Sequence, residues 1–431
     1  MNDDTIKLLN LEHIEHLIES IETVSSHQMI ALHLRLFKAP QTCPSCSHIT
    51  ERFHSYRMRQ ITHSVLLDKK YTLIYHARRY KCLMCGKVFY EHNPFSLKYE
   101  SISTYTKLSI LEYLKDYTHT FTSAAHTYFV SKQTVVDIFD HFVDAKRRSL
   151  PEVICMDEFY TSKVSKYKYA CVLFDFKYQK LIDIYPTRHK NYLIQVFSRF
   201  PIPEKKRVKA FVIDMWPSYK EVIELTFPHA LIAVDSFHII RNLNDAIRHI
   251  RIEVMNRYRL NKSAPEHDDM YYYMLKKFHY FFLKNYEDIH DGRIPVQKLN
   301  TYWHKSTILD YLLSIDDTLK SAYRLKERYR EFNLTADYET CDDELNELIR
   351  LFKNHDHHLF RDFGKTLQKW KKEIKNSFIK VNHRRLSNGP IEGVNNRIKT
   401  VIKSANGIKN FYRLRNRMLY SINKDVPIKL K

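Results

Sequence analysis

The segment Val153-Ile-Cys-Met-Asp-Glu-Phe-Tyr160 opens the series of short apolar runs that decides the fold. Its first four residues are apolar, and the fifth, Asp157, is a carboxylate. Four similar runs follow: YKYACVLFDF at 167–176, LIDIYP at 181–186, VKAFVID at 208–214 and HALIAVD at 229–235. Short apolar runs separated by helix-forming stretches are typical of an α/β sheet with buried strands. Residues 151–235 are therefore predicted to form strands with interspersed helices.

Three carboxylates stand out by their positions in this pattern. Asp157 and Asp214 each end an apolar run, and Glu392 lies at the start of a basic, Asn-rich helix. A carboxylate at the end of a buried strand is costly to desolvate without a counter-ion. Two such strand ends side by side, with a third carboxylate from a helix, would hold two divalent cations for phosphoryl transfer.

Other residues occupy comparable positions, so the pattern alone leaves the choice open. The competing carboxylates are Glu158, Asp175, Asp183 and Asp235. The acidic cluster at 342–344 is interpreted as a solvated helix face. His238 buttresses Asp235, neighbours the carboxylate site or has a purely structural role. Trp216 and Tyr219 could stack on a nucleic-acid base, although packing in the core is the favoured interpretation.

The composition excludes a nucleotide-binding loop and indicates a polyanionic partner. The chain has only six glycines among its 431 residues, and no pair has the GxGxxG or GxxxxGK[ST] spacing. It carries 70 Lys and Arg against 49 Asp and Glu, a net charge of +21. The last 71 residues contain 19 Lys and Arg but only four Asp and Glu, so the excess is concentrated in a basic tail. Nucleic acid is the expected partner.

The chain is expected to be a soluble cytoplasmic protein. It has no run of 18 apolar residues, and its acidic, amphipathic start is unlike a signal peptide. No membrane partner is predicted.

Two CxxC pairs predict a zinc site. Cys43 and Cys46 form one pair, and Cys82 and Cys85 form the other. Each pair can offer two thiolates from one tight turn, and two pairs complete a tetrahedral Zn²⁺ site. The 35 residues between the pairs exceed the usual spacing in a zinc ribbon and require strands of their own. The alternatives are four unrelated buried cysteines or a redox pair.

Residues 121–139 carry a helix-turn-helix pattern. Ala124 and Ala125 are small enough for a close helix crossing, and Ser131 is suited to cap the second helix. The residues that would then reach base edges at the start of that helix are Lys132, Gln133 and Thr134. The alternative is an ordinary helical hairpin.

Taken together, these motifs resemble those of the ISL3 family of bacterial insertion-sequence transposases, which have a DDE catalytic domain. The resemblance covers nearly the whole chain. It rests on both CxxC pairs, the helix-turn-helix, MDEF at 156–159, KYACVLFD at 168–175, VIDMWPSY at 212–219 and VDSFHII at 234–240. The most specific stretch is NGPIEGVNNRIKTVIKSANGIKNFYRLRNRML at 388–419.

The resemblance implies a multidomain α+β fold with an RNase H-like α/β catalytic domain. The expected domains are a zinc-ribbon-like domain at 1–95, a helix-turn-helix domain at 100–148, the catalytic domain at 150–240 and 381–431, and an all-helical insertion at 241–380. The implied catalytic triad is Asp157, Asp214 and Glu392, holding Mg²⁺ or Mn²⁺.

The implied activity is cleavage of DNA at the terminal inverted repeats of the element, followed by strand transfer to target DNA. The tail residues expected to contact DNA are Asn395, Arg397, Lys399 and Lys403, although Asn395 could serve only as a cap. A paired-end complex needs at least two chains, so a dimer on DNA is expected. The alternatives are a non-catalytic zinc and helix-turn-helix regulator and a structure-selective nuclease.

Overall fold

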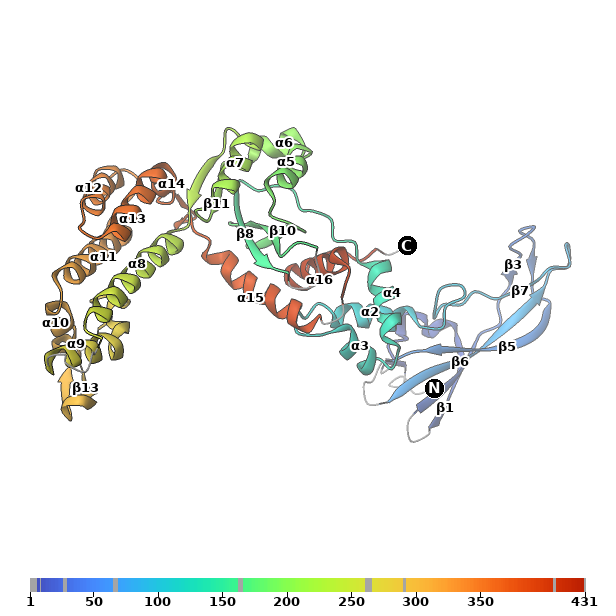
Figure 1. Ribbon diagram of the computed structural model, residues 1–431. Coiled ribbons are helices and arrows are strands. Elements are labelled where there is room, and N and C mark those ends of the chain that lie inside the picture. Colours follow the sequence, from blue (N-terminus) through green and yellow to red (C-terminus); the bar gives the residue numbers. More distant parts are fainter. Residues whose placement is uncertain are drawn as a thin grey trace. The chain divides into compact units, whose positions relative to one another are not determined.

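The computed structural model describes residues 6–7, 9–25, 29–64, 69–161, 166–259, 266–289, 292–405 and 408–429 (Figure 1). The chain folds into two compact units: Met1–Lys146 with Asn396–Lys431, and Arg147–Asn395. The boundary between the units falls inside one helix, α15 (Gly389–Ser404). The sequence analysis assigned the whole of 381–431 to the same domain as 150–240, whereas the contacts place 396–431 with the N-terminal residues.

The first unit contains a sheet in the order β1 (Ile18–Ser25), β2 (Met29–Leu36), β6 (Lys70–Lys81) and β5 (Phe53–Thr62), and β7 (Val88–Tyr90) also pairs with β6. Strands β2 and β6 are parallel, and the other pairs are antiparallel. The 3-10 helix η1 (Glu12–Leu17) precedes β1, and β3 (Gln41–Thr42) pairs with β4 (Ile49–Thr50) in a separate ribbon. The strands that the spacing of the two CxxC pairs requires are confirmed, because β5 and β6 lie between Cys46 and Cys82.

Three helices follow the sheet in the first unit: α2 (Thr104–Tyr113), α3 (Phe121–Thr127) and α4 (Lys132–Phe142). Each N-terminus is capped by a hydroxyl, which satisfies a backbone N–H that the helix itself leaves free. Thr120 and Ser123 form a reciprocal capping box on α3. Ser131 caps α4 by accepting from the N–H of Thr134 at 3.0 Å, as the sequence indicated.

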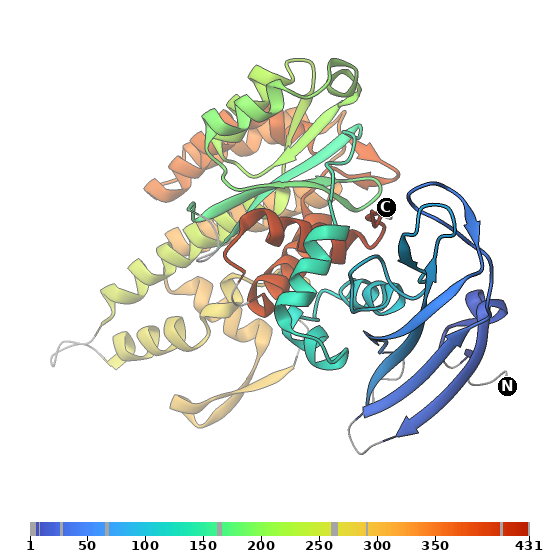
Figure 2. The same ribbon diagram turned by 90° about the vertical axis from the view of Figure 1, so that its right-hand side faces the viewer.

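The C-terminal helix α16 (Phe411–Asn423) completes the core of this helical group (Figure 2). Arg417 is only 3% exposed, and its guanidinium donates to the carbonyl oxygens of Leu114, Asp116 and His119. The hydroxyl of Tyr420 donates to the carbonyl oxygen of Leu111 at 3.1 Å. The chain beyond α15 is therefore tied to residues about three hundred positions earlier by hydrogen bonds to a helix end.

The second unit is built on a five-stranded sheet in the order β10-β9-β8-β11-β12. The bounds are β8 (Val153–Tyr160), β9 (Tyr169–Asp175), β10 (Lys180–Tyr185), β11 (Ala210–Ile213) and β12 (Leu231–Val234). Strands β8, β11 and β12 are parallel, whereas β9 is antiparallel to both β8 and β10. All five predicted runs are strands, and most of their residues are buried because both sheet faces are covered.

Helices surround this sheet and extend from it. Those between the strands are α5 (Lys190–Ser198), α6 (Ile202–Arg207) and α7 (Pro217–Thr226). A long helix, α8 (Ser236–Arg257), begins directly after β12 and leaves the sheet (Figure 1). The later helices are α9 (Glu266–Lys277), η2 (His279–Phe282), η3 (Gln297–Leu299), α10 (Lys305–Ser314), α11 (Asp317–Thr335), α12 (Cys341–Lys353), α13 (His358–Lys369) and α14 (Lys371–Asn376). One apolar cluster runs from Leu150 in the sheet region to Phe378, so sheet and helices share a core.

The description of 241–380 as all-helical is wrong in one respect. Strands β13 (Arg293–Val296) and β14 (Thr301–His304) form an antiparallel hairpin within it. Pro295 cannot continue a helix because it lacks an N–H, and Asn300 takes the left-handed conformation that the tight connection requires. A second short ribbon, β15 (Lys380–Val381) with β16 (Arg384–Arg385), precedes α15. Among the helices of the described ranges, none is long and apolar enough to cross a membrane.

Candidate functional site

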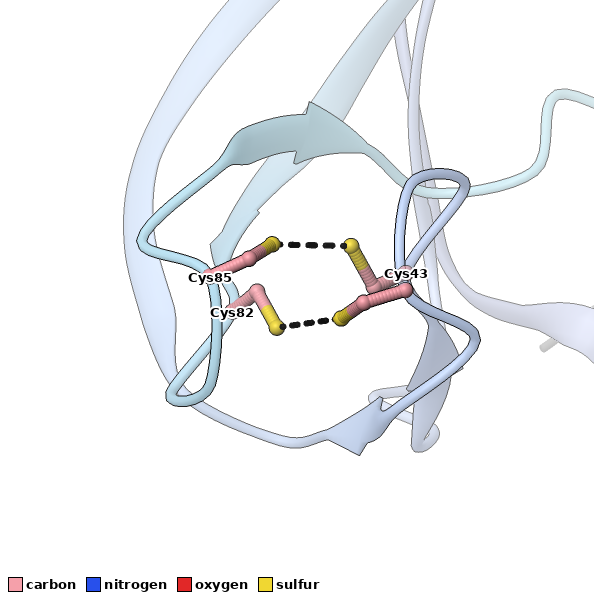
Figure 3. Close-up of side chains that lie close together, drawn as sticks. Cys43, Cys82 and Cys85 are labelled. Carbon is pink, nitrogen blue, oxygen red and sulfur yellow. Dashed lines mark hydrogen bonds between the residues drawn. The ribbon is translucent and has the colours of Figure 1, made fainter.

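The four cysteines of the two CxxC pairs converge in the first unit (Figure 3). Their sulfur atoms all lie within 4.8 Å of one another, with Cys43 Sγ 3.6 Å from Cys85 Sγ and Cys46 Sγ 3.5 Å from Cys82 Sγ. Ligands at the usual Zn–S distance in a tetrahedral site are separated by roughly 3.8 Å. The cluster therefore has the donor set and spacing of a four-cysteine zinc site.

Both halves of this cluster use the same backbone turn. In the first half, the N–H of Ser47 donates to the carbonyl of Cys43 at 2.9 Å; in the second, the N–H of Gly86 donates to that of Cys82 at 3.1 Å. Ser47 and Gly86 both have positive φ, 58° and 70°.

The thiols do not all ionise alike. Burial opposes ionisation of Cys43, but N–H groups of Ser45 and Cys46 outweigh it and lower its pKa to about 6. For Cys46, the hydrogen bond from the His48 N–H is outweighed by the contact with Cys82, which raises its pKa to about 12.

The predicted carboxylates Asp157 and Asp214 lie at one edge of the sheet in the second unit. Parallel pairing places Val212 beside Cys155 and Ile213 beside Val234. Continuing this register brings Asp157, Asp214 and Asp235 into one row. Asp214 and Asp235 directly follow β11 and β12, whereas Asp157 lies within β8, which continues to Tyr160. The structure thus brings together two predicted residues and Asp235, one of the competing carboxylates, whereas Asp175 ends the antiparallel strand β9.

Burial of these acids makes their ionisation unfavourable. Burial raises the pKa of Asp157 to about 6. A hydrogen bond from the Glu158 N–H opposes this rise, and the charge of Glu158 adds to it. Burial and the neighbouring charge of Asp157 raise the pKa of Asp214 to about 8. Burial also raises the pKa of Asp235, whose residue is 1% exposed. A divalent cation would stabilise the ionised form of all three carboxylates.

Two asparagines of the α15 region hold the aspartates. Asn388 Nδ2 donates to Asp214 Oδ1 at 3.2 Å, and Asn395 Nδ2 donates to Asp157 Oδ2 at 2.6 Å. Asn388 and Asn395 are 1% and 8% exposed. For Asn395 this contact differs from the predicted contact with DNA phosphates. The sequence analysis missed Asn388. The signal that could have found it is its separation from Asn395 by seven residues, or two helical turns, which places both side chains on one helix face.

Glu392 lies on the same face of α15, between the two asparagines. It follows Asn388 by four residues and precedes Asn395 by three, the spacings at which helical side chains are neighbours. Its side chain is exposed. In the described parts of the chain, Glu392 makes no hydrogen bond or ion pair with Asp157 or Asp214, so the structure brings its helix face, but not its carboxylate, into contact with the aspartates.

His238 also belongs to this edge of the sheet. Its Nε2 lies 3.1 Å from Asp214 Oδ2 and 4.0 Å from Asp235 Oδ2. The sequence linked His238 to Asp235, its neighbour one helical turn earlier, but Asp214 is the closer partner. Tyr219 is fully buried, as its core interpretation required, whereas Trp216 is partly buried beneath the guanidinium of Arg188, 4.4 Å from the ring centroid.

The residues predicted to contact DNA from α4 and α15 are mostly exposed. Lys132 and Gln133 lie in the first turn of α4, and Thr134 is partly buried there. The opposite face of α4 is buried through Val135, Ile138, Phe139 and Phe142. The exposed cations Arg397, Lys399 and Lys403 lie on the part of α15 that belongs to the same unit as α4.

The cysteine cluster yields a prediction about metal content. Purified protein should contain about one zinc ion per chain, because four thiolates complete a tetrahedral shell. Cys82→Ser should lose that zinc and destabilise the surrounding fold, as measured by elemental analysis and thermal melting. Cys341→Ser, a buried cysteine at the start of α12, is the matched control and should retain zinc. Zinc below about half an equivalent in wild type, or full retention in Cys82→Ser, would contradict the site.

The raised pKa values yield a prediction about stability. An aspartate ordinarily titrates near 3.8, so the folded protein binds more protons than the unfolded chain between about pH 4 and pH 8. The free energy of unfolding of metal-free protein should therefore fall as pH rises through this window and level off above it. Asp214→Asn should flatten the decline in a series of melting curves, and exposed Asp343→Asn should not. An unchanged slope in Asp214→Asn would refute the assignment.

Two models of known protein families match the sequence of this chain. A family model described as a transposase, with a DDE domain of the ISL3 type, matches residues 154–418. A second, described as the zinc-finger of the transposases of IS204, IS1001, IS1096 and IS1165, matches residues 39–85 and includes all four cysteines.

Two individual proteins are also similar to the chain. It is 21% identical over 386 residues to a transposase for insertion sequence element IS1001 from Bordetella parapertussis, a match covering 88% of both chains. It is 28% identical over 147 residues to an ATP-dependent protease from Lactococcus lactis subsp. lactis, covering 32% of this chain and 44% of that protein. Because the first family model spans more than half of the sequence, the chain belongs to the ISL3 family of insertion-sequence transposases.

Proposed function

We propose that this transposase binds the terminal inverted repeats of an insertion sequence, cuts DNA there and joins the freed 3′ end to target DNA. One observation carries the proposal: Asp157 and Asp214 lie in one row of the sheet, and the helix face that holds them through Asn388 and Asn395 also carries Glu392. A DDE triad requires this convergence of two strand ends and one helix.

The sheet supports an RNase H-like catalytic domain. Its order, β10-β9-β8-β11-β12, combines an antiparallel β8-β9-β10 meander with parallel β11 and β12. The carboxyl ends of the parallel strands meet at one edge, where ligands of open α/β sheets bind. We assign the catalytic domain to this unit, with Asp157 on β8, Asp214 after β11 and Glu392 on α15.

The carboxylates are the proposed ligands of divalent cations, either Mg²⁺ or Mn²⁺. Two cations held by Asp157, Asp214 and Glu392 would activate the attacking water or 3′-OH and stabilise the leaving oxygen. The protein fixes both carboxylate planes: Asp157 accepts from the Glu158 N–H at 2.7 Å and from Asn395, and Asp214 contacts Asn388 and His238. This arrangement leaves lone pairs on both acids for metal ions.

DNA recognition is assigned to the first unit. Helices α3 and α4, joined by four residues, have the length and capping of a helix-turn-helix whose second helix enters the major groove. Lys132, Gln133 and Thr134 would face the bases, and the zinc ribbon and the exposed cations of α15 would contact phosphates. The net charge of +21 supports this electrostatic role. A dimer on paired element ends completes the proposal.

The triad gives the decisive activity prediction. Wild-type protein with Mg²⁺ should cleave labelled DNA carrying the ends of the element and join it to a plasmid target. Asp157→Asn, Asp214→Asn and Glu392→Gln should each lower both rates roughly a thousand-fold, because a metal ion supplies several kcal/mol of transition-state stabilisation.

Asp343→Asn and Glu344→Gln are matched controls on exposed helix positions, and both should retain activity. Cleavage that persists in the triad variants would overturn the proposed catalytic residues. Cutting without joining in the wild type would favour the nuclease, whereas specific binding without cutting would favour the non-catalytic regulator.

A second prediction concerns the DNA-binding surface. Lys399→Ala, at an exposed position of α15, should weaken binding to element-end DNA and lower the slope of log affinity against log salt by about one, because one phosphate contact is lost. Gln133→Ala should instead reduce the preference for element ends over random DNA. Lys369→Ala, exposed on α13, is the control and should leave both quantities unchanged. A slope unaffected by Lys399→Ala would place the phosphate contacts elsewhere.

A further inference from the structure

Asp214, Asp235 and His238 offer three metal ligands at the edge where β11 and β12 end. One carboxylate oxygen from each aspartate and one imidazole nitrogen all lie within 4.8 Å of one another. Only Asp214 belongs to the proposed triad. Asp235 and His238 therefore form a donor pair that the proposed chemistry does not yet use.

Local structure explains why these two residues face the same point. Asp235 follows β12 and occupies the N-cap position of α8, with extended backbone angles. His238 comes three residues later, one turn into the helix, so its side chain lies on the same side. The N–H of Asp235 donates to the carbonyl of Ile213 at 3.0 Å, which fixes the turn beside Asp214.

Asp235 carries an unsatisfied buried oxygen, which points independently to a ligand. Its side chain is 2% exposed, and within the described residues Oδ2 has no hydrogen-bond partner. The amide oxygen of Asn388, whose nitrogen donates to Asp214, is likewise buried without a partner there. Buried polar atoms normally have partners, because desolvating an unpaired one costs roughly 1–3 kcal/mol. A cation bound between Asp235 and Asp214 would remove that cost for the carboxylate.

The distances fit the coordination shell of a divalent cation. Ligands about 2.1 Å from an octahedral ion are roughly 3.0 Å apart when adjacent and roughly 4.2 Å apart when opposite. His238 Nε2 is 3.1 Å from Asp214 Oδ2 and 4.0 Å from Asp235 Oδ2. An imidazole beside two carboxylates suits first-row transition ions such as Mn²⁺, whereas Mg²⁺ prefers oxygen ligands alone.

We propose that Asp214, Asp235 and His238 form one divalent-cation site, and that its imidazole ligand makes this site prefer Mn²⁺ to Mg²⁺. The inference rests on the proposed function only in sharing Asp214 with the triad. The proposal makes the two cation positions chemically unequal. At one position Asp157 and Glu392 offer only oxygen ligands, whereas at the other His238 adds a nitrogen ligand beside Asp214.

Metal binding to the full, zinc-loaded chain tests the proposal without reference to activity. The probe is Mn²⁺, measured by the paramagnetic resonance signal of the free ion, with Mg²⁺ added as competitor. His238→Ala and Asp235→Asn should each weaken the tighter class of Mn²⁺ binding at least about ten-fold, since loss of even an outer-shell partner costs roughly 10- to 100-fold. His249→Ala, at an exposed position, and Asp245→Asn, at a half-buried position paired with Arg248, lie on the same helix and should leave it unchanged.

A conservative variant separates ligation from folding. His238→Asp supplies oxygen in place of nitrogen, so it should retain cation binding but lower the ratio of Mn²⁺ to Mg²⁺ affinity. Melting curves of the zinc-loaded variants without added Mn²⁺ confirm that each variant is folded. Wild-type Mn²⁺ affinity in both His238→Ala and Asp235→Asn, or an unchanged affinity ratio in His238→Asp, would overturn the site and leave His238 as a hydrogen-bonding partner of Asp214.

The two proposals can fail separately. Mn²⁺ binding that depends on His238, in a protein that cuts no DNA, would retain this site and refute the proposed activity. If cleavage depends on the triad but the Mn²⁺ affinity is unchanged by substitution of His238 or Asp235, the proposed activity is retained and this site is refuted.

Discussion

The parallel register of β8, β11 and β12 is the constraint on which the site depends. It aligns Asp157, Asp214 and Asp235 in one row, although 78 residues separate the first from the last. The flanking apolar residues stabilise that row by burial, and the same burial makes the charged carboxylates unfavourable without a counter-ion. The burial that stabilises the fold therefore destabilises the ionised carboxylates at this edge, and a bound cation would offset that cost.

Helix α15 turns this row into a candidate active site. Asn388 and Asn395 reach aspartates 174 and 238 residues away in sequence, and their neutral amides orient the carboxylates without neutralising them. A lysine at either position would form an ion pair and compete with a cation. Two asparagines separated by two helical turns therefore support the aspartates while leaving their charge available, and Glu392 between them remains exposed.

Sequence patterns were sufficient wherever the determining interaction is local. The buried strands, the cap at Ser131 and the paired cysteine turns all follow from residue type and short spacing, and the structure confirms them. The hairpin at 293–304 and the contacts of Asn388 were missed because they depend on tertiary packing. The pattern also could not divide α15 between two units, since a continuous helix carries no local mark of what each end packs against.

Iron-directed cleavage of the protein backbone tests most directly whether Glu392 shares a cation site with the two aspartates. Fe²⁺ replacing Mg²⁺ generates hydroxyl radicals with ascorbate and peroxide, and mass spectrometry locates the cuts they make. Our account predicts cuts near Asp157, near Asp214 and within 388–395, all suppressed by excess Mg²⁺. Cuts at the two strand ends with none in 388–395 would contradict it, because the helix would then lie outside the metal site.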